Sequence, residues 1–411
     1  MIRMNRSLII KEPKGRKTMR KIGIVFCFVF LVLLFVPQNA EAIPAWAKKY
    51  GTDCSMCHRV GQSTLNSEGQ NFLRRGHRIS NDEVIMELDK LFSLNTKLRI
   101  RDSNASGYNS TFELHAFSVY TGGMLSNNFS YFTEMYLYEN TGKTSGPADS
   151  AYHSKLADAY LMYTSHPKSD TFTSFRVGQI SPSQMQLFWG VGPRYTETRN
   201  YLVNNSAVSP NTYKPFMRNF GAEIAQTVHN FHGALGILNG TGASFTNSVD
   251  NNESKDFYAT VDYSLDSEGS AVGVYGYKGK GLITPSSGSP WENEFSRVGL
   301  FGRCVKGPLS VTAAATKGRE QLDSKNTKAD NLGLLLEMDY ELNDKIALFG
   351  RYDYFDPNRS KQSDQLSGPM LGLNYRMFDQ GRMTVEYHKQ GKSVSTGSKP
   401  WEYRVEMAFI F

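Results

Sequence analysis

The 411-residue chain has few cysteines and almost no long apolar segments. One of its four cysteines, Cys27, lies inside the single long apolar run, residues 22–36, and the others are Cys54, Cys57 and Cys304. The three cysteines after this run are few and odd in number, which excludes a disulfide-rich framework. Because a membrane-spanning helix needs about 20 apolar residues, the lack of further runs excludes a helical membrane protein with several spans.

The chain also has little net charge outside its first 42 residues. The formal net charge is +7, but residues 1–42 contain eight Lys and Arg and only two Glu, which leaves 38 basic and 37 acidic residues in the remainder. The basic character therefore belongs to the N-terminal segment. No nucleic-acid partner is indicated for the rest of the chain.

Residues 1–42 have the pattern of an export signal. The basic Met19-Arg20-Lys21 precedes the apolar run at residues 22–36, and Ala40-Glu41-Ala42 forms an A-x-A cleavage site. This apolar run is shorter than the roughly 20 residues that a membrane-anchoring helix needs. We expect cleavage after Ala42, with residues 1–18 as an extension upstream of the true start.

The string Cys54-Ser55-Met56-Cys57-His58 is the strongest chemical motif. Two thiols three residues apart on a helical turn can each form a thioether to a haem vinyl group, and the adjacent imidazole can bind the iron. A redox dithiol would need a βαβ context, and a closed zinc site would need two more ligands at similar spacing. Following an export signal, the motif predicts one covalent haem c, held by Cys54 and Cys57 with His58 as the proximal iron ligand.

The sixth iron ligand stays open at this stage. His77 is the tentative choice, because it lies 19 residues after His58 and follows Gly76, which supplies backbone freedom for a return over the haem. The alternative for His77 is a surface histidine in a basic run. Met86 is a second candidate ligand and would raise the redox potential, and a barrel residue such as His388 is a third. Redox potential and direction of electron flow both depend on which of these residues is the ligand.

Charged side chains give weaker candidates. The basic residues Arg74, Arg75 and Arg78 are candidates to pair with haem propionates, with a solvated basic face as the alternative. Six acidic residues are candidates for a lumen that attracts cations, although porin lumens are charged in any case. These are Glu337, Asp339, Glu341, Glu386, Glu402 and Glu406. Cys304 is interpreted as an inert strand residue.

From Leu91 onward, short aromatic-rich segments alternate apolar and polar residues with period two. Even positions of residues 332–342 are mostly apolar, whereas the odd ones include Glu337 and Asp339. Sixteen such segments are expected: 91–101, 111–122, 129–139, 154–164, 172–179, 219–228, 231–239, 257–265, 271–278, 294–305, 308–316, 331–342, 345–354, 369–377, 381–389 and 401–411. A soluble β-sandwich would rarely keep such a contrast between its two faces over the whole chain. The pattern predicts an all-β fold, a 16-stranded transmembrane β-barrel over residues 91–411.

Connections between these segments alternate in length. Short turns such as Asn343-Asp344 alternate with long polar loops such as 180–218, 240–256, 279–293 and 317–330. Outer-membrane barrels have short turns on the periplasmic rim and long loops on the outer rim, so we expect the long loops to face outward. Residues 43–90 remain for the haem, and roughly 50 residues cannot bury a porphyrin alone. We therefore expect a short N-terminal helical c-type haem plug, with barrel residues lining one side of the haem site.

Several residues around the haem motif carry a family resemblance. They are Ile43-Pro44-Ala45-Trp46-Ala47, Leu65-Asn66, Gly69, Phe72 and Gly76. Together with the C-x-x-C-H string and the barrel, they resemble the fused outer-membrane cytochrome-porin family, whose best-known members are monohaem c-type iron oxidases of iron-oxidising bacteria. The likeness is specific over residues 43–78 and architectural beyond them, and Glu68 and His77 replace aromatic residues of the family pattern.

The resemblance implies electron transfer from extracellular ferrous iron, through one haem c, to a periplasmic c-type cytochrome. It also implies a barrel in contact with outer-membrane lipid. Two alternatives remain from the sequence. One is an outward electron conduit to extracellular metals, and the other is a passive porin with a structural haem.

Overall fold

The computed structural model describes residues 45–60, 64–79, 90–104, 110–140, 155–182, 188, 194–204, 218–240, 250, 252–285, 287–361, 364–389 and 400–411. The predicted export signal and Met86 lie outside the described residues. None of the helices in these ranges is both long and apolar enough to cross a membrane.

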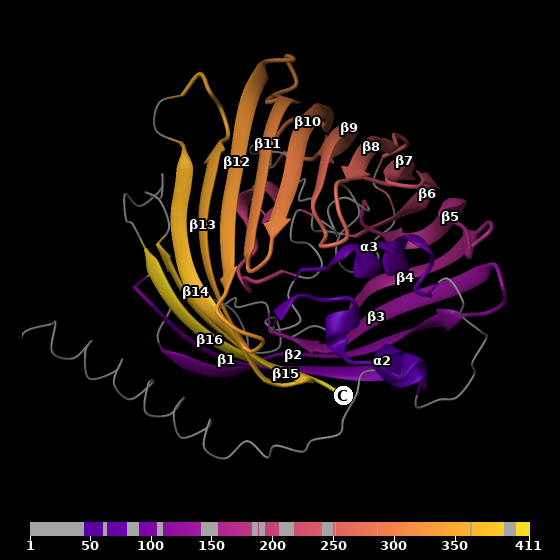
Figure 1. The fold of residues 1–411 in the computed structure, drawn as a ribbon. Coiled ribbons are helices and arrows are strands. Elements are labelled where there is room, and N and C mark those ends of the chain that lie inside the picture. Colours follow the sequence, from indigo (N-terminus) through magenta and orange to yellow (C-terminus); the bar gives the residue numbers. More distant parts are fainter. Residues whose placement is uncertain are drawn as a thin grey trace, which may run out of the picture. The chain divides into compact units, whose positions relative to one another are not determined.

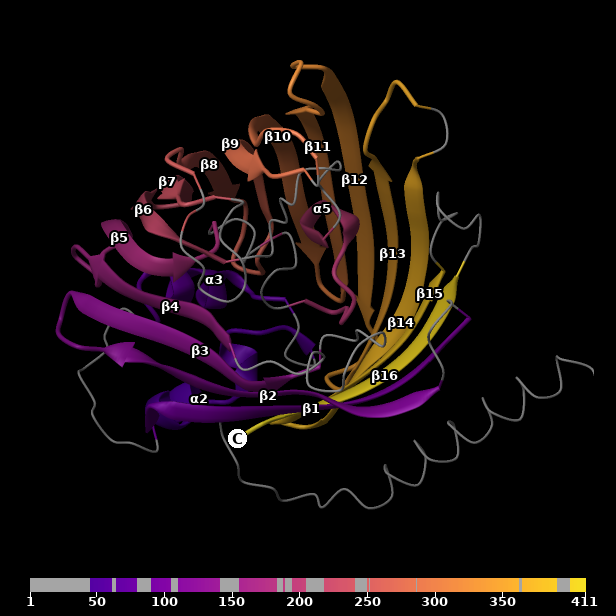
Figure 2. The same cartoon turned by 180° about the vertical axis from the view of Figure 1, so that it is seen from behind.

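Sixteen antiparallel strands form one closed barrel, in which each strand pairs with its neighbours in the sequence (Figures 1 and 2). The barrel closes between β1 and β16, where Leu98 lies opposite Met407. The predicted 16-stranded barrel is thus confirmed. The strands are β1 Phe92–Ser103, β2 Thr111–Met124, β3 Phe129–Glu139, β4 Lys155–Thr164, β5 Thr171–Ile180, β6 Asn219–Val228, β7 Phe231–Leu238, β8 Asp256–Ser264, β9 Ala271–Ile283, β10 Trp291–Lys306, β11 Leu309–Gln321, β12 Lys328–Glu341, β13 Ile346–Asp356, β14 Leu366–Phe378, β15 Gly381–Lys389 and β16 Trp401–Ile410.

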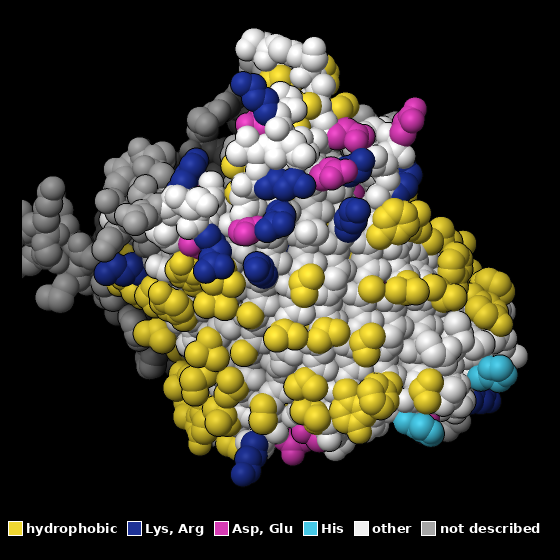
Figure 3. Space-filling view, turned by 90° about the horizontal axis from the view of Figure 1, so that it is seen from above, with side chains coloured by type: hydrophobic (Ala, Val, Ile, Leu, Met, Phe, Trp, Pro, Cys, Tyr) yellow, Lys and Arg dark blue, Asp and Glu magenta, His cyan; other side chains and the backbone are white. Residues whose placement is uncertain are grey.

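The alternation of the strands separates an apolar outer face from a polar lumen. In β12, Leu336 and Met338 are 47% and 49% exposed, whereas Glu337 and Asp339, which alternate with them, are buried inside the barrel. Figure 3 shows apolar side chains spread over the strand wall, with charged side chains gathered beyond them. Such an outer face suits contact with lipid, because its apolar side chains form no hydrogen bonds with water.

The six acidic lumen candidates do face inward, but five of them are neutralised by arginines. Arg351 lies 3.6 Å from Glu337, Arg59 2.8 Å from Glu341, and Arg99 2.7 Å from Glu406. Arg404 pairs with both Glu386 and Glu402. The lumen wall is therefore a network of paired charges, and the acidic residues do not by themselves make it attract cations.

Two hairpins extend beyond the predicted strand ends. Strand β9 extends to Ile283, and β10 already begins at Trp291. In the β11–β12 hairpin, only residues 322–327 lie outside the strands. Many of the added outward side chains are charged, such as Lys280, Lys317 and Arg319. Cross-strand pairs such as Lys280 with Glu294, at 3.1 Å, stabilise the extension. The apolar-out rule did not find these strand ends because charged side chains interrupt their outer face.

The N-terminal segment lies in the short-turn mouth of the barrel. It contains α2 Ala45–Tyr50, the 3₁₀ turn Cys54–Met56 and α3 Ser67–Arg74, drawn in indigo in Figure 1. Polar groups of the segment contact five of the short turns. The pairs are Cys54 with Asp379, Arg59 with Gly307, Gln70 with Gly269, Arg75 with Asp170, and Arg78 with Asn127.

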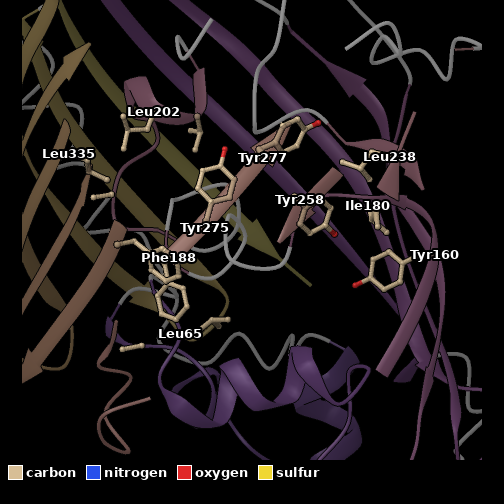
Figure 4. Packing of buried hydrophobic residues seen from close by; sticks show 14 of the residues in the cluster. Leu65, Tyr160, Ile180, Phe188, Leu202, Leu238, Tyr258, Tyr275, Tyr277 and Leu335 are labelled. Carbon is tan, nitrogen blue, oxygen red and sulfur yellow. The ribbon is translucent and has the colours of Figure 1, made fainter. Parts of the chain in front are cut away.

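The loop between β5 and β6, residues 181–218, does not lie on the outer rim as the sequence suggested. Its described part turns into the lumen, where Tyr195 and Leu202 are fully buried. Helix α5, Tyr201–Asn204, packs against β12 and β13. Figure 4 shows Phe188 of this loop directly above Leu65 of the N-terminal segment. Loop and segment therefore meet inside the barrel and narrow it.

Trypsin added to intact cells tests this topology. Lys325 is exposed at the tip between β11 and β12, and Lys168 is exposed in the short turn between β4 and β5. We expect cleavage after Lys325 on intact cells, because long-loop ends face outward, and cleavage after Lys168 only once the outer membrane is permeabilised. Peptide mass mapping reads both sites. Cleavage after Lys168 in intact cells would reverse the orientation.

Candidate haem site

The C-x-x-C-H string forms a capped 3₁₀ turn. The Asp53 carboxylate accepts a hydrogen bond from the Ser55 amide at 2.8 Å, and the His58 amide donates to the Cys54 carbonyl at 2.9 Å. Residues three apart are eclipsed in such a turn. Cys54 and Cys57 therefore lie on one side, directly before His58, as attachment to a single planar group requires.

This turn borders a cavity of about 400 Å³ between the N-terminal segment and the barrel wall. The volume is in the usual range for a site that encloses a small organic group, about 300–1,000 Å³. From the segment, the cavity is lined by Trp46, Cys54, Cys57, His58, Phe72 and His77 among others. From the barrel, it is lined by Leu91, Asn95, Tyr120, Gly122, Phe132, Tyr160, Ala408 and Ile410 among others.

Asn66 and Gly69 hold α3 against the cysteine turn. The Asn66 side chain accepts a hydrogen bond from the Gly69 amide at 2.9 Å, which caps α3, and donates to the Met56 carbonyl at 3.0 Å. A Cβ on Gly69 would collide with the carbonyl oxygen of Cys57. A glycine is therefore required where the helix crosses the turn, which explains two residues of the family resemblance.

Trp46 and Phe72 make an apolar wall beside the cavity. Their rings meet edge to face at 5.0 Å, and the Trp46 indole donates to the Gly122 carbonyl of β2 at 3.1 Å. Phe72 is buried and also contacts Tyr50. These rings attach α2 and α3 to the barrel and exclude water from one side of the cavity.

His77 is a buried residue of the cavity and not a surface histidine, since only 1% of it is exposed. It has a positive φ of 59° after Gly76 at 78°, so the predicted backbone freedom is used there. Its ring packs against both Trp46 and Phe132, with centroids at 5.1 and 4.7 Å, and these two rings also contact each other at 5.8 Å. Burial, aided by Arg176 and Arg78, lowers the pKa of His77 to about 3, so the imidazole is neutral at physiological pH.

The two ring nitrogens of His77 differ. Nε2 lies 2.7 Å from the Tyr160 hydroxyl, whereas Nδ1 has no hydrogen-bond partner among the described residues. A buried polar atom without a partner is costly. The other ligand candidate among the described residues is His388 of β15. It does not line the cavity, and its ring lies beside that of Tyr201 in α5.

The cysteine environment does not favour thiolate chemistry. Burial, together with the charges of Glu68 and Cys54, raises the pKa of Cys57 to about 12. Redox dithiols and zinc ligands need thiolates and therefore lowered pKa values. Within the described ranges, no three His, Cys, Asp or Glu side chains are grouped to hold a metal ion. The donor set fits covalent attachment of a haem better than the two alternatives.

The arginines of α3 and its C-terminal end bind the barrel. Arg74 forms a buried ion pair with Asp262, Arg75 lies 3.1 Å from Asp170, and Arg78 donates to a carbonyl of the first short turn. Removing one partner of a buried ion pair costs roughly 3–5 kcal/mol, because the other charge is left unpaired. These three residues therefore anchor the segment. The cations that line the cavity are Lys97, Arg194, Arg199, Arg218 and Arg382, which the sequence did not single out.

Comparisons with known proteins identify the barrel but no family. No family model and no curated protein matches the chain. OmpT of Vibrio cholerae, expressed in the outer membrane, is similar with a TM-score of 0.54 at 11% identity, covering 80% of this chain and 100% of that one. An anion-selective porin from Comamonas acidovorans has a TM-score of 0.53 at 12% identity, covering 78% and 98%. Salmonella typhi OmpF, in complex with daunomycin, is similar with a TM-score of 0.51 at 12% identity, covering 78% of this chain and 97% of that one. At such identities the likeness establishes the porin-type barrel fold alone.

Proposed function

We propose that this protein transfers electrons across the bacterial outer membrane through one covalent haem c. Its substrate is extracellular ferrous iron, and it passes electrons to a periplasmic c-type cytochrome. The observation that carries the proposal is the C-x-x-C-H turn at the wall of a cavity that the buried His77 also lines. Bound haem would supply the one-electron redox chemistry.

Each residue of the site has a distinct role in this proposal. Cys54 and Cys57 hold the cofactor by thioethers, and His58 binds its iron. Trp46 and Phe72 exclude water from the cavity on the side of the N-terminal segment. Such shielding keeps the surroundings of the iron apolar, which is one of the protein's means of setting a redox potential.

The barrel supports the proposed location. Its apolar outer face and its likeness to porins fit an outer membrane. The N-terminal segment lies in the short-turn mouth, which in outer-membrane barrels faces the periplasm. A periplasmic acceptor would then approach the cysteine turn from outside the barrel.

Two other functions are compatible with the same fold. An outward conduit would use the same cofactor with the opposite direction of electron flow. A passive porin with a structural haem is supported by the porin-type barrel. The inward loop and the N-terminal segment disfavour a wide porin channel, because both narrow the lumen.

Stopped-flow mixing with ferrous iron separates these functions. The oxidised, purified protein is mixed without oxygen, at acidic and at neutral pH, and the haem absorbance is followed. We expect reduction of the haem, because outer-sphere transfer needs access to the haem edge and no fixed ligands for the iron. No reduction at either pH would favour the outward conduit or the porin.

A further inference from the structure

Charged side chains of the outer wall gather at the long-loop end of strands β9 to β12. Figure 3 shows Lys and Arg along one edge of the apolar wall. At this end of the four strands, the outward cations are Lys278, Lys280, Lys317, Arg319 and Lys328, and the outward carboxylates are Glu292, Glu294 and Asp330. We call these eight residues the outer charged belt. Five cations against three carboxylates leave it with two positive charges in excess.

The belt begins where the apolar wall ends. Leu300 of β10 lies opposite Val274 of β9 and Ala315 of β11. Leu300 and Val274 are 61% and 49% exposed on the outer face. Toward the long loops, Lys317 follows two residues after Ala315, and Lys278 four residues after Val274. Because this end of an outer-membrane barrel faces outward, the belt lies where the acyl chains of the outer leaflet meet their head groups.

Three cations of the belt surround one position of β10. Ser296 lies opposite Lys278 of β9 and Arg319 of β11, and Lys317 is the next outward residue on the same strand as Arg319. Adjacent strands are about 4.8 Å apart, and alternate residues of one strand are about 6.8 Å apart. The backbones of the three cations therefore lie within about 12 Å of one another, which their long side chains can span to reach one anion.

Two lysines of the belt are not used in its ion pairs. The pairs are Lys280 with Glu292 and with Glu294, both at 3.1 Å, and Arg319 with Asp330 at 2.8 Å. Lys278 and Lys317 are exposed and form no ion pair within the part of the chain that the structure describes. They act on Glu294 and Asp330 only at longer range. Both ammonium groups are therefore available to an external anion.

We propose that the outer charged belt binds the phosphate groups of lipopolysaccharide, the phosphorylated glycolipid of the outer leaflet, with Lys278 and Lys317 as its main contacts. The phosphates of this glycolipid lie directly above its acyl chains, at the level of the belt. Ammonium and guanidinium groups form charge-assisted hydrogen bonds with phosphate oxygens. Basic side chains grouped at a membrane surface attract anionic lipid. The apolar side chains beside the belt, such as Val274 and Leu300, would contact the acyl chains of the same molecule.

Replacement of both lysines in the full-length protein tests this proposal. Lys278→Gln/Lys317→Gln removes two charges of the belt, and Lys278→Arg/Lys317→Arg retains them. Lys306→Gln/Lys345→Gln is the matched control, because both of these exposed lysines lie at the short-turn end of the barrel. Native mass spectrometry in detergent measures the binding of diphosphorylated lipid A, of dephosphorylated lipid A and of phosphatidylglycerol. The heat-dependent shift of the barrel on gels shows that each variant is folded.

We expect the affinity for diphosphorylated lipid A to fall roughly fivefold for each lysine removed, and thus roughly 25-fold in Lys278→Gln/Lys317→Gln. The arginine variant and the control should bind like the wild type, and dephosphorylated lipid A should bind equally weakly to all four proteins. Equal binding of diphosphorylated lipid A by the wild type and Lys278→Gln/Lys317→Gln would overturn the proposal. Phosphatidylglycerol that binds the wild type as tightly as diphosphorylated lipid A would also overturn it, since the belt would then attract any anionic lipid.

Discussion

Cys57→Ala is expected to lose essentially all covalent haem. The 3₁₀ turn presents Cys54 and Cys57 on one side, and the hydrogen bond from the His58 amide to the Cys54 carbonyl, at 2.9 Å, keeps the histidine in register with both. Loss of one thiol removes the pair that holds the vinyl edge against the cavity. Denaturing gels stained for haem peroxidase activity measure the effect, and Cys54→Ala should behave alike.

Cys304→Ala is the matched control for these variants. Cys304 is exposed on the outer face of β10, away from the cavity, so its loss should leave the haem stain at the wild-type level. A band retained in both Cys54→Ala and Cys57→Ala would show that neither cysteine carries the cofactor.

His77→Ala should change the ferric haem from six-coordinate to five-coordinate. His77 lies in the same cavity as the cysteine turn, and its Nδ1 atom lacks a hydrogen-bond partner among the described residues. Coordination to iron would satisfy that atom. The near-infrared absorption of the ferric protein distinguishes a second imidazole from a methionine ligand, and it should change in His77→Ala.

The matched control is His166→Ala, since His166 is exposed in the short turn between β4 and β5. Met86→Ala is measured beside it, because Met86 is the alternative ligand. A methionine-type band in the wild type, or an unaltered spectrum in His77→Ala, would move the assignment to Met86 or to another residue of the lumen.

The strands could be predicted from the sequence because a membrane barrel imposes one rule on every strand. Residues that face the lipid must be apolar, and residues that face the lumen may be polar. The residue type alone therefore predicts that Leu336 faces outward and Glu337 inward. The rule holds only where lipid contacts the wall. Beyond it, the β9–β10 extension carries Lys280 and Glu292 on its surface and gave no such signal.

The inward loop was missed because its composition is that of a surface loop. Its buried part depends on contacts with residues far away in the sequence. The Tyr195 hydroxyl donates to Glu341 at 2.8 Å, and Thr198 binds Glu386. The short run Tyr201-Leu202-Val203 is the local signal of burial, and it is too brief to identify a lumen helix.

The candidate site was only partly accessible from the sequence. The local motif gave Cys54, Cys57 and His58, and Gly76 pointed to His77. Two features depend on how distant strands surround the N-terminal segment: the partners of its arginines, and the cationic residues that line the cavity. Arg74, for example, pairs with Asp262 on β8, and no spacing along the chain could reveal that pair.

Electron transfer across a sealed membrane tests the central claim most directly. The protein is reconstituted into phospholipid vesicles that contain an oxidised c-type cytochrome and a coloured chelator of ferrous iron, and ferrous iron is added outside. We predict reduction of the enclosed cytochrome by the wild type without the colour of the ferrous chelate, and no reduction with Cys57→Ala. Equal reduction by both proteins, or reduction that follows chelate formation, would contradict the account and identify the barrel as a pore for iron.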